Sequence, residues 1–186
     1  MPIISRATAS LDAEAALPMA LLLQHLKDPE EEELVISAAR SGALAWIEKR
    51  AKKSLSRRPW LAKCTPPIDR LELPNGPVAS VTTFRYYDQA NVGQVWPASS
   101  YRLSGDEITR NSSTSWGTAF SRMAIEIEYI AGYQDLGLEA PALQSAALLL
   151  AGHLYRNREQ NTSIALASMP FGVEMLIDAD RIPVIA

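Results

Sequence analysis

Residues 123–160, MAIEIEYIAGYQDLGLEAPALQSAALLLAGHLYRNREQ, change their hydrophobic period part-way along. In the first eight residues apolar and polar side chains alternate, so Ile125, Ile127 and Tyr129 share one face of a strand. From Pro141, which suits the first turn of a helix, almost every residue is apolar for several turns. A helix that is apolar nearly all round is buried on several sides. The stretch therefore predicts a half-buried strand and then a buried helix, whose cover can include neighbouring subunits.

The preceding region, residues 55–133, is punctuated by prolines, glycines, serines and threonines. Asn75-Gly76 lies between two prolines, which is a strong turn signal. Two β-rich segments, 81–88 and 94–103, are separated by a short polar loop and predict a hairpin. We interpret this region as a small antiparallel β subdomain.

The N-terminal region is predicted to be helical. Asp12 suits the cap of a short helix, and a second helix is expected to start in the acidic run 28–33 and to end in a lysine-rich segment. Acidic residues at a helix start and basic residues at its end both suit the helix dipole. The apolar stripe expected on this second helix comprises Leu34, Val35, Ala38, Ala39, Gly42, Ala45 and Trp46.

The fold class predicted from these segments is α+β. A small helical bundle, formed by the N-terminal helices and a helix at about 141–160, carries an inserted antiparallel β subdomain and an extended C-terminal arm. The arm is apolar and irregular, whereas a solvated disordered tail would be polar, so we expect it to dock on a partner. The expected segments are N-terminal helices at 1–54, the β subdomain at 55–133, the long apolar helix at 134–161 and the docking arm at 162–186.

Composition and charge bound the class of protein. The chain has 186 residues, of which 47% are apolar and 21% charged, and its net charge is -3. Such a chain can bury a core, and its acidic balance argues mildly against strong non-specific nucleic-acid binding. Cys64 is the single cysteine, which excludes an internal disulfide. With no signal-peptide pattern and no apolar run of membrane-spanning length, we expect a soluble protein of a reducing cytoplasm.

The sequence offers little for catalysis, metals or cofactors. His25 and His153 have no second histidine or cysteine at ligand spacing, and no glycine-rich phosphate loop is present. Cys64 follows a lysine that could lower its pKa, but no base is placed beside it, so a structural thiol is favoured. Glu126 and Glu128 share a strand face, which is typical of a solvated surface rather than of an acid–base pair. We expect no catalytic residue, no metal and no cofactor.

Two charged segments leave alternatives open. In HLYRNREQ, residues 153–160, a helix-ending cluster of ion pairs formed by Arg156, Arg158 and Glu159 accounts for the charges. The alternatives are an anion site at the two arginines, or an enzyme that uses His153, Arg156 and Glu159. A basic run is interpreted as the cationic end of a helix, with contact to DNA or an acidic partner as the alternative. The residues of that candidate contact are Lys52, Lys53, Arg57 and Arg58.

The order of motifs resembles a known family. LPNGPVASV, EYIAGY, HLYRNRE and PFGVEML follow one another along the chain, after an acidic-headed helix that ends in AKKSL. In this order the chain is similar to the head–tail connector (adaptor) family of long-tailed phages, in the larger branch that carries a β insertion between its helices. The resemblance runs from about Leu17 to Ile182. Two departures are the closing IDADR, where only Arg181 matches, and RAKKS, where Ala51 and Lys52 replace Thr-Gly and predict a longer helix.

The resemblance implies a virion structural protein. Such a protein forms a homo-oligomeric ring of about twelve copies at the head–tail interface, joins the portal to the stopper or tail-completion proteins, and lets genomic DNA pass without sequence specificity. It is assembled in the cytoplasm of the bacterial host and needs no membrane. The C-terminal segment is expected to reach the portal. The expected contacts of this arm are Met169, Pro170, Phe171, Val173, Met175, Leu176, Ile177 and Arg181.

Overall fold

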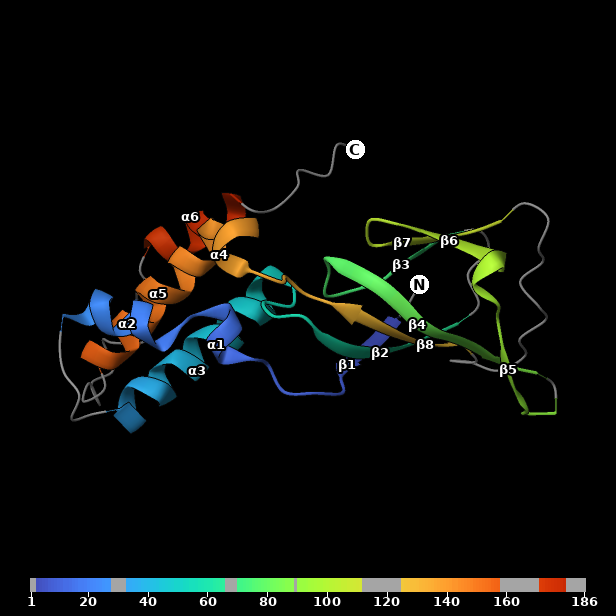
Figure 1. Ribbon diagram of the computed structural model, residues 1–186, viewed down its shortest axis with the longest axis horizontal. Coiled ribbons are helices and arrows are strands. Elements are labelled where there is room, and N and C mark those ends of the chain that lie inside the picture. Colours follow the sequence, from blue (N-terminus) through green and yellow to red (C-terminus); the bar gives the residue numbers. More distant parts are fainter. Residues whose placement is uncertain are drawn as a thin grey trace. The chain divides into compact units, whose positions relative to one another are not determined.

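The computed structural model describes residues 3–27, 33–65, 70–88, 90–111, 125–157 and 171–179. The chain divides into two compact units, each built from two separate stretches of sequence. Met1–Leu11 and Arg57–Gly132 form the β unit, and Asp12–Ser56 and Tyr133–Ala186 form the helical unit (Figure 1). Antiparallel sheet in one unit and helices in the other confirm the α+β class.

The β unit contains two antiparallel sheets. In the first, the strand order is β1-β2-β8-β4-β5, and in the second it is β3-β7-β6. The predicted hairpin of 81–88 and 94–103 is confirmed only next to its loop, because β4 pairs with the short β5, whereas the rest of the second segment forms η2 and then β6 of the other sheet. The elements are β1 (Ile3–Ala7), β2 (Arg58–Cys64), β3 (Arg70–Glu72), β4 (Val78–Tyr87), β5 (Gly93–Val95), the 3-10 turn η2 (Ala98–Ser100), β6 (Tyr101–Ser104), β7 (Glu107–Arg110) and β8 (Ile125–Ala131).

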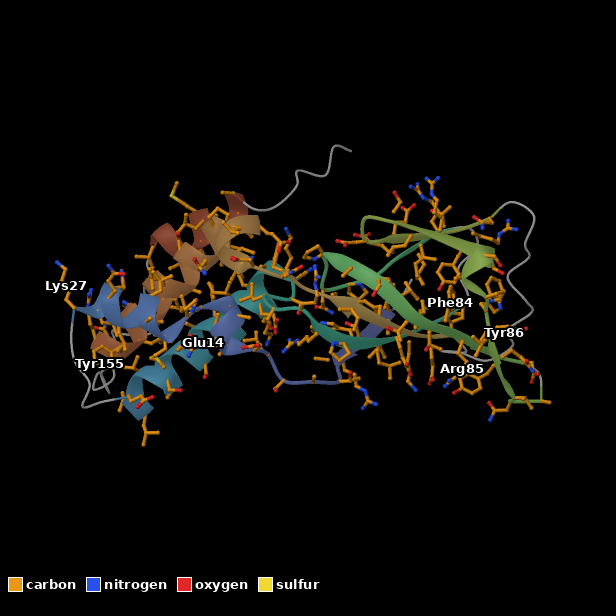
Figure 2. All side chains as sticks on the ribbon, in the orientation of Figure 1. Glu14, Lys27, Phe84, Arg85, Tyr86 and Tyr155 are labelled. Atoms are coloured by element: carbon orange, nitrogen blue, oxygen red, sulfur yellow. The ribbon has the colours of Figure 1, made fainter. Side chains whose placement is uncertain are left out.

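The core of the β unit is shared by the two sheets. Ile125, Ile127 and Tyr129 are buried along β8, as the alternation predicts. Phe84 of β4 packs on Trp96, with ring centroids 5.6 Å apart, and residues of the second sheet complete the cluster (Figure 2). The alternating pattern is sufficient here, because a strand has only two faces and one of them is polar.

The turn predicted at Asn75-Gly76 is confirmed, and it requires a glycine. Asn75 has a left-handed φ of 62°, and the following Gly76–Pro77 peptide bond is cis. A Cβ on Gly76 would lie 2.0 Å from a carboxylate oxygen of Asp106, whose other oxygen accepts the Val78 amide at 2.7 Å. Only glycine fits against a carboxylate held this close. The turn thereby ties the start of β4 to the β6–β7 connection.

The helical unit is built around its central helix, α5. This helix contacts α2, α3, α4 and α6, and its buried face includes Leu143, Ala146, Ala147 and Leu150. Burial of the apolar helix that begins at Pro141 is therefore confirmed. The elements are α1 (Ala13–Ala16), α2 (Met19–Leu26), α3 (Glu33–Ala51), α4 (Leu136–Glu139), α5 (Pro141–Arg156) and α6 (Phe171–Ala179).

Two segment predictions are wrong at the ends of the chain. Residues 1–54 are not all helical, because Ile3–Ala7 forms β1 and pairs with β2. Its alternation spans only five residues, and its pairing partner lies more than fifty residues away, so no local signal identifies it. The arm at 162–186 is not extended throughout, because Phe171–Ala179 is helical. This helix contacts α3 and α5.

The second helix ends earlier, and buries a different face, than predicted. It stops at Ala51, because Lys52 adopts a left-handed φ of 57°. The predicted apolar stripe lies largely in solvent, since Leu34 is 87% exposed and Val35 39%. The buried face instead comprises Ile36, Arg40, Ala43, Leu44 and Ile47. A helix with apolar residues on two sides does not reveal which side its own chain covers.

Candidate functional site

A charged brace organises the first helices of the helical unit. The side chain of Asp12 caps α1 by accepting the amides of Glu14 and Ala15. The Glu14 carboxylate accepts the Met19 amide at 3.1 Å and pairs with the Arg40 guanidinium at 2.7 Å. The Arg40 side chain is only 7% exposed. Glu14 therefore joins α1, α2 and α3, a stabilising contact that the sequence pattern did not single out.

The carboxylate pair on β8 lies on the outer face of the larger sheet. Glu126 pairs with the Lys63 ammonium and accepts a hydrogen bond from the Tyr87 hydroxyl at 3.1 Å. The Lys63 hydrogen bond is the main reason that the pKa of Glu126 lies below its ordinary value. Glu128 is exposed. An ionised, salt-bridged glutamate is a poor general acid, so the surface interpretation is favoured.

A shallow hollow of about 370 Å³ lies in the β unit. Among its lining residues, Glu128 carries the carboxylate and Tyr129 the phenol. The Tyr129 hydroxyl donates to the Pro74 carbonyl at 2.8 Å, and burial raises the pKa of Tyr129 to about 12. Neither group is paired there with a nucleophile or an imidazole. The hollow is lined by Thr8, Pro59, Trp60, Leu61, Thr82, Glu128, Tyr129 and Ile130.

Cys64 lies at the end of β2 and is fully buried. Burial raises the pKa of its thiol to about 11, so the thiolate is scarce near neutral pH. The neighbouring Lys63 does not lower this pKa, because its ammonium group is paired with Glu126. The structural role predicted for the thiol therefore agrees with its surroundings.

The described residues offer neither a metal site nor a membrane-spanning helix. Within those residues, histidine, cysteine, aspartate and glutamate nowhere gather in groups of three or more that could hold a metal ion. Within the same residues, no helix has the length and apolarity needed to cross a membrane.

HLYRNREQ lies at the C-terminal end of α5. The Asn157 amide nitrogen lies 3.1 Å from His153 Nδ1 and donates to the His153 carbonyl at 2.8 Å. Arg156, the last residue of α5, is exposed. Arg158 and Glu159 lie outside the described residues, so the predicted ion-pair cluster stays a prediction. His153 interacts locally with its own helix end, which is what the helix-end interpretation expects.

The predicted basic contact is divided between the two units. Lys52 and Lys53 belong to the helical unit, and Arg57 and Arg58 to the β unit. The Arg58 guanidinium lies over the Trp60 ring, 4.9 Å from its centre, which is a cation–π contact. Arg58 therefore has a structural partner in the β unit, and both Lys52 and Arg57 are exposed.

Part of the predicted arm packs against its own chain instead of being free to bind a partner. Val173 and Ile177 of α6 are buried in the helical unit, and Glu174 lies 3.8 Å from the Arg50 guanidinium of α3. These two apolar residues are therefore not available as free anchors, whereas Met175 is 60% exposed. Met169, Pro170 and Arg181 lie outside the described residues, as does the side chain of Phe171. Leu176 is half-buried.

Comparison with known proteins gives a consistent result. No protein-family model and no curated protein sequence match the chain. The chain does match chains in solved structures of gene transfer agent (GTA) particles. A chain of the "Neck of native GTA particle computed with C12 symmetry" is 28% identical, with a TM-score of 0.74, over 95% of this chain and 93% of that chain. A chain of the "Virion of native gene transfer agent (GTA) particle" is 27% identical, with a TM-score of 0.74, over 98% and 97%.

A third similarity agrees over a comparable length. A chain of the "Neck of empty GTA particle computed with C6 symmetry" is 27% identical, with a TM-score of 0.71, over 95% of this chain and 94% of that chain. The chain is a head–tail connector. This connector is a structural protein of the virion, as its motifs predict, and its similarity to neck chains extends across both of its units.

Proposed function

We propose that the connector forms a homo-oligomeric ring of about twelve copies at the head–tail interface. The ring lies between the portal and the stopper or tail-completion protein of its particle. The observation that carries this proposal is the similarity, over 95% of the chain, to a chain of a neck computed with C12 symmetry. Assembly takes place in the cytoplasm of the bacterial host, before the tail is joined.

The connector acts as a mechanical part rather than as an enzyme. Its shifted ionisable groups support this, because the pKa shifts of Cys64 and Glu126 keep the thiol protonated and the carboxylate ionised near neutral pH. A protonated thiol is a poor nucleophile, and an ionised glutamate is a poor general acid. His153 contacts Asn157 at its own helix end instead of a catalytic partner.

Genomic DNA passes through the channel of the ring without sequence-specific contacts. The net charge of -3 supports this part of the proposal, because a strongly basic channel would hold the phosphate backbone and oppose sliding. Lys52 and Arg57 are exposed and are the residues of the basic run best placed for weak phosphate contacts.

The C-terminal segment contacts the portal through residues on either side of α6, including Met169, Pro170 and Arg181. Burial of Val173 and Ile177 supports an α6 that is anchored in its own unit. A suitable variant therefore lacks residues 180–186 and keeps α6, since removing α6 would uncover the apolar surface of the helical unit. We expect this truncation to weaken portal binding at least tenfold while the protein stays folded.

The experiment that tests the function uses the full-length connector and the portal of its own particle. Electron microscopy of the mixture is expected to show rings of about a dozen subunits stacked coaxially on the portal. A connector that stays monomeric and does not bind the portal would contradict the proposal. The truncated variant, examined in the same way, separates failure of the C-terminal contact from failure of the ring.

A further inference from the structure

One side of α3 that faces solvent carries mainly apolar and small residues. Leu34 at its start is 87% exposed, and Ala38, Gly42 and Ala45 follow on the same side at helical spacing. The line ends with the exposed cation Lys49. These five residues, spaced by three or four, define the α3 outer face. Three small residues in a row along one side of a helix allow another helix to approach closely. Burial of an exposed leucine side chain against that helix is favourable.

The α3 outer face continues onto the neighbouring helix. A Cβ on Gly42 would lie 3.6 Å from a methyl group of Leu154, so Leu154 of α5 borders the small residues. Leu154 is itself 39% exposed, as is Val35 on the other border. The small residues of α3 and the larger Val35 and Leu154 beside them therefore form one continuous apolar patch. Exposed apolar patches of this kind mark interaction sites.

A second apolar face lies on α6. Gly172, Met175 and Ala179 are exposed on one side of the helix, with the exposed carboxylate of Asp178 beside them. Met175 is 60% exposed, and a Cβ on Gly172 would meet nothing within 4 Å. These four residues define the α6 outer face. Figure 1 shows α3, α5 and α6 in the helical unit, where α6 packs on α5 and also contacts α3.

We propose that the α6 outer face of one copy packs on the α3 outer face of the next copy in the ring. The inference rests on the proposed ring function. A closed ring of more than two copies needs two different, complementary patches on every subunit, and the helical unit presents two.

The two faces fit in shape. Met175 projects from the α6 outer face, whereas Ala38, Gly42 and Ala45 leave a shallow strip on the α3 outer face. Methionine is flexible and fills irregular apolar gaps well.

The test uses cysteine pairs in the full-length connector. Ala38→Cys and Met175→Cys are combined in one chain, and the protein is oxidised after assembly and run on a denaturing non-reducing gel. Cys64 is fully buried, so it leaves the wild-type protein as an unreactive control. The double variant is expected to give a ladder that reaches about the size of the closed ring, and each single variant is expected to stay monomeric on the gel.

Other outcomes overturn the inference in distinguishable ways. A dimer from Ala38→Cys alone would show that two α3 outer faces meet. Wild-type rings by electron microscopy without any ladder would exclude this pair of faces and leave the proposed function intact. A wild-type protein that never forms rings would contradict both.

A second variant keeps the test independent of disulfide geometry. Ala38→Glu places a charge in the α3 outer face and is expected to weaken ring assembly at least tenfold in sedimentation, with an unchanged circular dichroism spectrum. The matched control is Val92→Glu, at a residue of the β unit that is 51% exposed. Ring assembly equal to that of the control would overturn the assignment of the face.

Discussion

The β unit and the helical unit treat their apolar residues differently. In the β unit, Phe84 and Tyr129 are almost fully buried, and the charged Lys63 and Glu126 on the outer sheet face pair with each other. In the helical unit, α5 is well covered, but α3 and α6 also present apolar residues to solvent. The exposed apolar residues of the β unit, Ile4, Val92 and Val95, lie in β1 and at or beside β5, whereas those of the helical unit line helix faces that a second copy can cover.

The largest expected effect tests the core of the β unit. Phe84→Ala removes a ring that contacts both Trp96 and Tyr101, and it should lower the free energy of unfolding by about 3–5 kcal/mol. The matched change in the other unit is Leu34→Ala, which is expected to stay within about 0.5 kcal/mol in the monomer. Urea unfolding of both variants measures the difference. Equal losses would show that Leu34 is already covered within its own chain.

A smaller effect is expected at the charged brace of the helical unit. Glu14→Gln removes the charge that faces the buried Arg40, and we expect a loss of about 1–2 kcal/mol, because a charged hydrogen bond is weakened and Glu14 itself lies in solvent. Glu33→Gln, at the exposed start of α3, is the control and should be nearly neutral. Urea unfolding of the two variants measures the difference. Equal stability of both would show that the Glu14–Arg40 pair does not stabilise the helical unit.

The buried thiol predicts a pH dependence. The pKa of Cys64 rises from 9.0 to about 11 on folding, so above about pH 9 the unfolded chain loses a proton that the folded chain keeps. Stability should therefore fall as pH rises through this window, by roughly 1 kcal/mol between about pH 9 and 10. Tyr129, with a pKa of about 12, adds a similar loss from about pH 10 upward.

The matched variant for this pH dependence is Cys64→Ala, whose stability should fall less over the same interval because it has no thiol to titrate. Denaturant unfolding at the two pH values compares the variant with the wild type. Identical slopes would mean that the thiol is accessible to water in the folded protein.

The smallest expected effect concerns the basic run. Arg57→Gln removes an exposed cation and should change stability by less than about 0.5 kcal/mol. The isolated connector is expected to show no duplex-DNA binding at about 150 mM salt, with or without the substitution. Salt-dependent binding that is lost on neutralising Arg57 and Arg58 would instead support a DNA-binding module.

What the sequence predicts well is local. The Ile125, Ile127 and Tyr129 alternation, the Asp12 cap and the Asn75-Gly76 turn each follow from side chains within a few residues, and all are confirmed. The face of α3 depends on which other helices are present, so its burial could not be predicted from period alone. The pairing of β1 with β2 joins residues far apart in the chain, and no short pattern encodes it.

The candidate site was predicted less completely. The resemblance identified the connector class, because several weak motifs in a fixed order are more specific than any one of them. It did not reveal that Val173 and Ile177 of the expected arm pack inside their own unit, since an apolar segment looks the same whether it docks on its own chain or on a partner.

The most direct test of the account is electron microscopy of the full-length connector mixed with the portal of its particle. Closed rings of about a dozen connector subunits, stacked coaxially on the portal, are expected. A connector that stays monomeric and leaves the portal bare would contradict it.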